Sequence, residues 1–334
     1  MRSLSTVQGW SGYRVAVRSL LLSIVAVLVV VPGYAGIDPV VRLAPGADVR
    51  IRRYVPAGGW PARIGRLEPV AAVVLDSAAP GFGGFSALAL ANGRATLLGD
   101  SGNWLRLRIA NGRVVSRETG ALGAGPGRGW SKEDRDSESL AIDPASGGAW
   151  VGFERANEIW RYDPALQHGE AHRAPREMAE WWANSGAESL ARFPDGTFVA
   201  IAERTRGPLR PALLFLGDPA ERATRIVRFG YRPPAGYDPS DAAVLPSGDL
   251  VVLNRRHLGW LRFSAKLVVV PRAAIRAGAI VQGREIATLA APIIDENCEG
   301  LAISRENGAT MLWLTTDNDQ MLLRRTYLMK FRLR

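Results

Sequence analysis

Five segments of the chain repeat one short phrase, and this repeat constrains the fold more than any other feature. Each phrase joins a small or acidic residue to an apolar run, a turn and a second apolar run. The phrases begin at Ser86, Glu138, Glu188, Asp241 and Glu299, so successive starts lie 52, 50, 53 and 58 residues apart. Each of the five turns contains an Asn-Gly, Asp-Gly or Ser-Gly pair, which supplies the backbone conformations that hairpins need. We therefore interpret each phrase as two antiparallel strands of a repeated sheet.

A repeat of this length predicts an all-β propeller. A four-stranded blade takes roughly 40 to 50 residues, and blades bury their faces only by stacking on one another. The roughly 299 residues that follow residue 35 then predict a six-bladed β-propeller at about 50 residues per blade. We expect strands near Val70–Leu75 and Thr326–Leu333 to form the sixth blade, so that the N- and C-terminal strands close a single ring. Residues 36–70 are either a linker or part of the closing strand.

The first 35 residues have the features of a secretory signal peptide. Several arginines precede an apolar run from Leu20 to Val31, and small residues at Gly33 and Ala35 suit a signal peptidase. The run is shorter than the roughly 18 residues that a membrane-spanning helix needs. We expect residues 1–35 to be removed and residues 36–334 to form the propeller domain. This predicts a periplasmic or secreted protein with no transmembrane segment after cleavage.

The basic charge of the chain comes almost entirely from arginine. The 42 basic residues include only Lys132, Lys266 and Lys330 as lysines, and the formal net charge is +10. The arginines are scattered along the chain, whereas a nucleic-acid-binding protein concentrates positive charge in a patch or stripe. This pattern argues against a nucleic-acid partner and favours an anionic small molecule or ester as substrate. We expect the protein to act as a monomer.

Acidic residues stand at the beginning and the end of the repeated hairpins. Because the two strands of a hairpin are antiparallel, these residues meet at one end of the repeat. If the strands are innermost in their blades, the acids crowd one mouth of the central channel, where a hard cation such as calcium would relieve their repulsion. The predicted metal ligands are Glu138, Glu154, Glu188, Glu203, Asp241, Glu299 and Asp317.

The alternative is a channel whose acids are neutralised by arginines and bind no metal. Arg155, Arg204 and Arg255 each follow the residue that ends a second strand. In these positions they could pair with the acids of the mouth. The sequence leaves both interpretations open.

Several of these phrases resemble the phytase-like family known for esterase-like activity. They are Asp136-Ser137-Glu138-Ser139-Leu140-Ala141, Gly152-Phe153-Glu154-Arg155, Gly186-Ala187-Glu188-Ser189-Leu190, Asp241-Ala242-Ala243-Val244-Leu245-Pro246 and Asn297-Cys298-Glu299-Gly300-Leu301-Ala302. The resemblance runs from about Phe85 to the end of the chain. It implies an exported bacterial propeller that hydrolyses a phosphoester or a carboxylic ester.

One position departs from the pattern of that family. Asn254 stands where the family has an acid, and an amide can ligate calcium but cannot act as a base. If the protein is a hydrolase, calcium would neutralise a phosphate or polarise a carbonyl, and a glutamate would accept a proton from water. The candidate catalytic residues are Glu188 and Glu299. The arginines expected to hold the anionic group are Arg155, Arg204, Arg255 and Arg256.

Two other functions fit the same pattern. One is a non-catalytic propeller that binds an anionic partner of the cell envelope, such as a polysaccharide or a lipid head group. The other is a lactonase similar to the gluconolactonase propellers. An enzyme needs a desolvated, metal-loaded carboxylate cluster, whereas a binding propeller tolerates acids that are each paired with an arginine.

Overall fold

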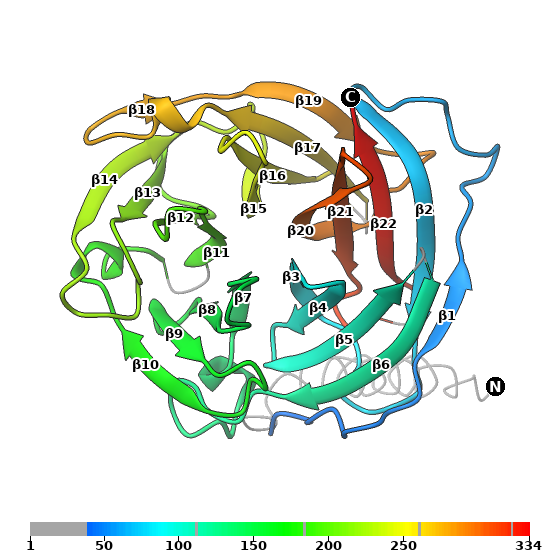
Figure 1. Cartoon of the computed structure of the whole chain (residues 1–334), viewed down its shortest axis with the longest axis horizontal. Helices are drawn as coiled ribbons and strands as arrows, with labels where there is room; N and C mark the ends of the chain where they lie inside the picture. The colour runs from blue at the N-terminus through cyan, green and yellow to red at the C-terminus, as the bar shows by residue number, and fades with distance from the viewer. Residues whose placement is uncertain (1–38, 111–112, 183–184, 260–261, 322) are drawn as a thin grey trace, which may run out of the picture. The chain divides into compact units, whose positions relative to one another are not determined.

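The computed structural model describes residues 39–110, 113–182, 185–259, 262–321 and 323–334. Residues 40–334 form one unit, whose strands gather into five sheets around a central channel (Figure 1). Helix within the described residues is limited to three short 3-10 turns, Lys132–Asp134 (η2), Arg176–Met178 (η3) and Arg272–Ala274 (η4). The protein is therefore an all-β propeller, in which each sheet is one blade.

We number the blades 1 to 5 in the order in which their inner strands occur in the chain. The strands of each blade are given from the inner strand outward. Blade 1 contains β3 (Phe85–Ala91), β4 (Arg94–Gly99), β5 (Asn103–Ala110) and β6 (Arg113–Ala121). Blade 2 contains β7 (Ser137–Ile142), β8 (Ala149–Phe153), β9 (Glu158–Tyr162) and β10 (Gly169–Arg173). Blade 3 contains β11 (Ala187–Arg192), β12 (Phe198–Ala202), β13 (Arg210–Phe215), β14 (Ile226–Tyr231) and β18 (Ile280–Val281).

The last two blades complete the ring. Blade 4 contains β15 (Asp238–Val244), β16 (Leu250–His257), β17 (Phe263–Val270) and β19 (Arg284–Leu289). Blade 5 contains β20 (Asn297–Glu306), β21 (Ala309–Asp317) and β22 (Thr326–Leu333), followed outward by β2 (Leu67–Asp76) and β1 (Arg50–Arg53).

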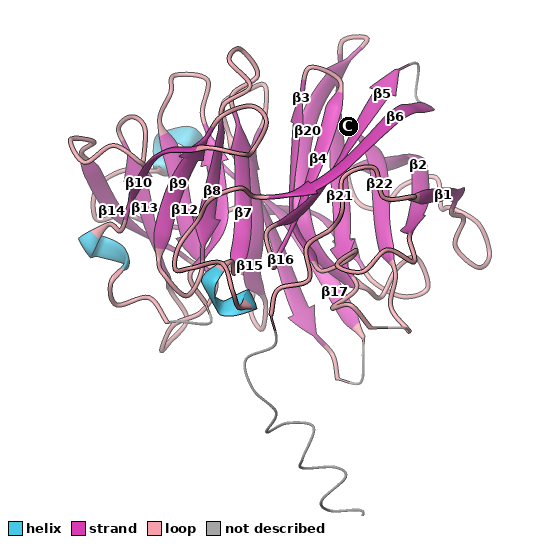
Figure 2. Cartoon of the chain, turned by 90° about the horizontal axis from the view of Figure 1, so that it is seen from below, coloured by secondary structure: helices cyan, strands magenta, loops and turns pink. Residues whose placement is uncertain are grey.

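The five repeated phrases form the five innermost strands. β3, β7, β11, β15 and β20 each lie at one edge of their sheet and contact the next inner strand around the ring (Figures 1 and 2). All five begin at one mouth of the channel, which we call the acidic mouth, and end at the opposite one, which we call the far mouth. Residues at the same position of each phrase therefore share one level of the channel.

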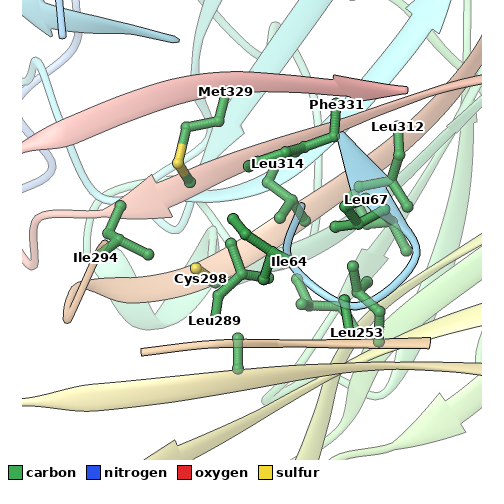
Figure 3. Packing of buried hydrophobic residues seen from close by; sticks show 14 of the residues in the cluster. Ile64, Leu67, Leu253, Leu289, Ile294, Cys298, Leu312, Leu314, Met329 and Phe331 are labelled. Carbon is green, nitrogen blue, oxygen red and sulfur yellow. The ribbon is translucent and has the colours of Figure 1, made fainter. Parts of the chain in front are cut away.

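The core is divided into five apolar clusters, one between each pair of neighbouring blades. In the cluster between blades 4 and 5, Leu253 and Leu289 of blade 4 face Leu314 and Met329 of blade 5 (Figure 3). Complete burial of one such side chain contributes roughly 1.5 to 3 kcal/mol. Each blade thus depends on both of its neighbours for stability.

The prediction of six blades is wrong, because the two ends of the chain join an existing blade. β2 pairs with β22 from Leu67↔Leu333 to Leu75↔Thr326, and β22 pairs in turn with β21 of the fifth hairpin. The terminal strands therefore extend blade 5 instead of forming a sixth. Residues 43–47 lie along blade 1, where the Leu43 backbone N–H donates to Asn103 Oδ1 (2.9 Å) and the Ala47 backbone N–H donates to Thr119 Oγ1 (2.9 Å). The five blades thus contain the residues that the prediction had divided among six.

The predicted signal peptide, residues 1–35, lies outside the described residues. Its cleavage therefore stays a prediction. Within the part of the chain that the structure describes, no helix is long and apolar enough to cross a membrane. Within residues 36–70, which the sequence left between linker and closing strand, residues 50–53 form β1 and residues 67–70 begin β2.

Ring closure generates the first prediction. Val73 lies in the middle of β2 and pairs with Leu328 of β22 on one side and Arg53 of β1 on the other. Val73→Pro removes a backbone donor from a central strand, so we expect the free energy of unfolding to fall by about 3 kcal/mol or more. The matched control is Val115→Pro, which places proline at the bulge of the edge strand β6. Thermal denaturation of both variants measures the difference, and equal stabilities would contradict this role of β2.

Candidate functional site

The same backbone irregularity sets one residue of each inner strand apart at the acidic mouth. The register against the second strand of the blade skips one residue, which marks a β-bulge. The skipped residues are Ser86, Glu138, Glu188, Ser240 and Glu299. A bulge leaves its extra residue unpaired and redirects its side chain. Three of the five blades therefore present a glutamate at this level, and two present a serine.

The serines at this level fasten neighbouring blades together. Ser86 Oγ donates to the carbonyl oxygen of Ser137 in blade 2 (2.7 Å). Ser240 Oγ donates to the carbonyl oxygen of Cys298 in blade 5 (3.1 Å). Blades 1 and 4 therefore contribute a contact between blades where the other three contribute a carboxylate.

Asp241, one of the predicted metal ligands, lies one residue beyond the bulge of its strand. The equivalent of Glu138 in blade 4 is Ser240. Asp241 Oδ1 accepts the backbone N–H of Ala242 (2.7 Å) and Oδ2 accepts that of Leu301 in blade 5 (2.6 Å). Its carboxyl group therefore connects two blades, and it belongs to neither of the carboxylate groups that could hold a metal.

Two groups of carboxylates at the acidic mouth have the spacing of metal ligands. One contains Asp136, Glu138 and Glu154, and the other contains Glu154, Glu188 and Glu203. Within each group the candidate ligand oxygens all lie within 4.8 Å of one another. Glu138 is half-buried and the other four are buried. Glu154 belongs to both groups, so the five carboxylates form one continuous cluster.

A single arginine lies inside the ring of acids. Arg255 Nη1 donates to Glu299 (2.5 Å) and to Asn297 (3.0 Å), while Nη2 donates to Glu203 (2.9 Å). Burial by itself would lower the pKa of Arg255, but Glu299, Glu203 and Glu188 raise it well above its usual value. Arg255 is therefore a permanent counter-ion of the mouth.

Arg255 neutralises only part of the cluster. Among the described residues, Glu138, Glu154 and Glu188 have no basic side chain within ion-pair distance. These three carboxylates lie together on the side of the channel formed by blades 2 and 3. The charge of the mouth is thus unevenly compensated.

The other predicted arginines lie at the rim of the mouth. Arg155 Nε donates to Asp136 (2.9 Å), and Arg204 Nε donates to Asp238 (2.9 Å). Arg256 is exposed and has no ion-pair partner among the described residues. Of the four predicted arginines, Arg256 is therefore the one whose guanidinium group is not already engaged with an acid.

Burial and mutual repulsion raise the pKa values of the clustered acids. Burial, followed by the nearby Asp136 and Glu203, raises the pKa of Glu154 to about 7. Burial and neighbouring carboxylates raise the pKa values of Glu138 and Glu188 well above the usual value of a glutamate. Without a cation, the cluster therefore holds protons at neutral pH. A divalent cation would take the place of these protons.

Glu299 and Asp317 lie beside the cluster and belong to neither metal-ligand group. Glu299 Oε1 accepts from Arg255 and also from Asn297 Nδ2 (2.7 Å). Burial raises the pKa of Glu299 to about 7, although Arg255 opposes the shift. Burial and Glu299 raise the pKa of Asp317 well above its usual value. The structure thus places Glu299 next to the cluster as a fixed carboxylate that titrates near neutral pH.

Two residues of the mouth were missed by the sequence analysis. Asp136 precedes the bulge residue of β7 by two positions, so alternation along a strand could have placed it beside Glu138. Lys132 has no comparable signal, because η2 places its Nζ 2.6 Å from Asp100 and 4.0 Å from Asp136. Burial would lower the pKa of Lys132, but Asp100 and Asp136 raise it.

Asn254 faces away from the cluster. Its Oδ1 accepts from the Tyr231 hydroxyl (2.9 Å) and its Nδ2 donates to the Val252 carbonyl (3.1 Å). The amide oxygen that the sequence offered as a calcium ligand is therefore bonded to the neighbouring blade 3.

Comparison with known proteins adds one sequence match. A family model described as "Phytase-like: Esterase-like activity of phytase" matches residues 80–320. No curated protein matches the chain in sequence.

Solved structures with similar folds have low sequence identity. Glutaminyl cyclase from Myxococcus xanthus is 12% identical, with a TM-score of 0.43, and the match covers 89% of this chain and 100% of that chain. Regucalcin from Agrobacterium tumefaciens, a calcium-binding protein, is 11% identical, with a TM-score of 0.41, and the match covers 75% of this chain and 91% of that chain. At these scores the likeness carries no argument about activity.

The raised pKa values predict how the stability of the metal-free protein depends on pH. Glu154 and Glu299 have pKa values of about 7 in the folded protein, against a reference value of 4.5. Between these values the folded state binds more protons than the unfolded state, so stability falls as pH rises from about 4.5 to about 7. Each group contributes at most about 1.4 kcal/mol per pH unit. We expect Glu154→Gln to flatten the decline when denaturation is followed in a chelating buffer. An unchanged pH dependence would contradict the titration of this residue.

Proposed function

We propose, because this chain belongs to the phytase-like family, that it hydrolyses a phosphoester or a carboxylic ester at the acidic mouth. One observation carries the proposal. Glu138, Glu154 and Glu188 lie together at the mouth without a basic partner among the described residues. Such a group of buried acids without a basic partner is costly to fold, and clustered titratable groups with strongly shifted pKa values are typical of active sites.

The donor set of the mouth fits calcium. Calcium binds about 6 to 8 oxygen ligands and prefers carboxylates, and every side chain in both groups is a carboxylate. The residues that would hold the ion are Asp136, Glu138, Glu154, Glu188 and Glu203. When bound, calcium would offset the negative charge of a phosphate or of a carbonyl oxygen under attack.

Glu299 is our candidate for the general base, and Glu188 is better suited to metal binding. Both hydrogen bonds of Glu299 fall on Oε1, and its donors Arg255 and Asn297 fix the orientation of the carboxylate. This arrangement leaves Oε2 to accept a proton from an attacking water. A pKa of about 7 suits a base that works near neutral pH. Glu188, by contrast, lies within a metal-ligand group.

Arginines at the rim would bind the anionic part of the substrate. Arg256 is exposed and has no acidic partner among the described residues, so its guanidinium group is available for a phosphate or a carboxylate. Arg155 and Arg204 would first have to leave Asp136 and Asp238. We therefore assign the first contact with substrate to Arg256.

A non-catalytic propeller that binds an anionic envelope partner is the second candidate. It is favoured by the ion pairs that Arg155, Arg204 and Arg255 make with acids of the mouth. In this case the acids would orient the arginines toward the partner. The two functions differ in whether any substrate is turned over.

We also propose that the protein works in the periplasm or outside the cell. The apolar run Leu20–Val31 and the small residues that follow it support removal of residues 1–35.

Calcium binding is the first test of the proposed function. We expect calorimetry on residues 36–334 to detect a stoichiometric calcium site, and Glu188→Gln to weaken binding at least tenfold because it removes a charged ligand. Glu180→Gln is the matched control, because Glu180 is exposed and lies outside both groups. Absence of calcium binding in the unmodified protein, or equal binding in Glu188→Gln, would refute the metal site.

Turnover of a panel of aryl phosphates and aryl esters tests the catalytic assignment. We expect Glu299→Gln to lower kcat by about 10²- to 10⁴-fold, as the loss of a general base does, while calcium binding is retained. Glu180→Gln again serves as the control. Full activity in Glu299→Gln would rule out this base. Calcium binding without turnover of any panel member would favour the binding propeller.

A further inference from the structure

The far mouth of the channel has a chemical character opposite to that of the acidic mouth. Four residues beyond the bulge, each inner strand places one half-buried side chain at the same level of the channel. These residues are Leu90, Ile142, Arg192, Val244 and Ile303. Four of the five are large aliphatic residues, although they stand where the channel meets solvent. The far mouth is therefore an apolar ring with one cation.

A groove leads outward from this ring between the hairpin turns of blades 1 and 5. It has a volume of about 760 Å³, and its apolar floor is formed by Leu90, Ile109, Pro144, Ile303 and Trp313. A hollow of about 210 Å³ inside the channel shares Leu90, Pro144 and Ile303 with it. We call the two together the far groove. Its size falls within the range of about 300 to 1,000 Å³ that is typical of small-molecule sites.

Arginines without acidic partners border the far groove. Arg305 lines the groove, and Arg94 and Arg106 line a small hollow of about 70 Å³ that shares Ala91 and Asn92 with it. Among the described residues, none of these three arginines has a carboxylate within ion-pair distance. Arg106 instead donates to Thr96 Oγ1 and to the Pro164 carbonyl.

Two acids near the groove are already paired with basic side chains. Glu306 lines the groove, but its carboxylate is paired with Lys330 (2.5 Å). Asp143 is paired with Arg192 (3.4 Å), the one cation of the apolar ring. The rim of the groove therefore carries an excess of positive charge.

The arginines of blade 1 also repel one another. In the pairing of β4 with β5, Arg94 lies directly opposite Arg108, and like charges in this position are destabilising. Burial lowers the pKa of Arg106, Glu118 on the neighbouring strand opposes this shift, and Arg94 adds a smaller lowering. An anion placed among these arginines would relieve the repulsion.

We infer that the far groove binds a single-chain anionic amphiphile, with its aliphatic tail on the apolar floor and its anionic head among the rim arginines. The apolar ring favours an aliphatic tail, because burial of each methylene group contributes about 0.8 kcal/mol. The arginines without acidic partners favour an anionic head group. The far groove contains none of the residues assigned to hydrolysis, so binding there can be tested independently of the proposed activity.

Binding of dodecyl phosphate below its micellar concentration tests this inference. We expect calorimetry on residues 36–334 to show one molecule bound per chain, with inorganic phosphate binding at least a hundredfold more weakly because it lacks the tail. Arg305→Glu should weaken binding at least tenfold. Arg222→Glu should leave it unchanged, because Arg222 is an exposed arginine outside the groove.

A floor variant completes the design. Ile303→Asn should weaken binding of dodecyl phosphate at least tenfold, and circular dichroism would establish that it folds. If Ile303→Asn fails to fold, shortening the alkyl chain of the ligand tests the floor in the unmodified protein, and affinity should fall with each pair of carbons removed. Equal affinity for inorganic and dodecyl phosphate, or no binding of either, would overturn the inference. Binding to phosphatidylglycerol vesicles without binding of the monomeric amphiphile would also overturn it, in favour of a membrane surface.

Discussion

The pairing of β2 with β22 is the constraint on which the rest of this structure depends. It joins strands from opposite ends of the chain and closes the ring. A closed ring lets each of the five apolar clusters be covered on both sides by blades. It also fixes the five inner strands side by side around the channel. The carboxylates at the mouth can be held close together because this scaffold resists their repulsion.

Each of the five inner strands has the same β-bulge at the acidic mouth. The bulge redirects Glu138, Glu188 and Glu299, whereas Ser86 and Ser240 at the same level connect neighbouring blades. Carboxylates and contacts between blades are thus distributed among equivalent positions of the five inner strands.

Arg255 neutralises only part of the negative charge at the acidic mouth. Arg255 donates to Glu203 and Glu299, and the remaining carboxylates keep raised pKa values because burial and neighbouring charge oppose their ionisation. Pairing every carboxylate with an arginine would leave less negative charge for a cation, and leaving every carboxylate unpaired would make the site harder to fold. The observed arrangement lies between these limits and is suited to binding.

The repeat by itself determined the five hairpins and placed Glu138 beside Glu154 and Glu188 beside Glu203, because strand alternation and antiparallel pairing are local properties. The inner position of the five phrases, which brings the acids of blades 2 and 3 together, was decided by the closed ring. Only the tertiary structure decided the number of blades, since strands 67–76 and 326–333 find each other across the whole chain. It also decided the place of Asp241, because a bulge one residue earlier moves its side chain out of the cluster. The roles of Arg255 and Lys132 depend on contacts between blades and loops distant in sequence. A β-bulge displaced by one residue changes which side chain reaches the channel, and the repeated phrases do not reveal this displacement.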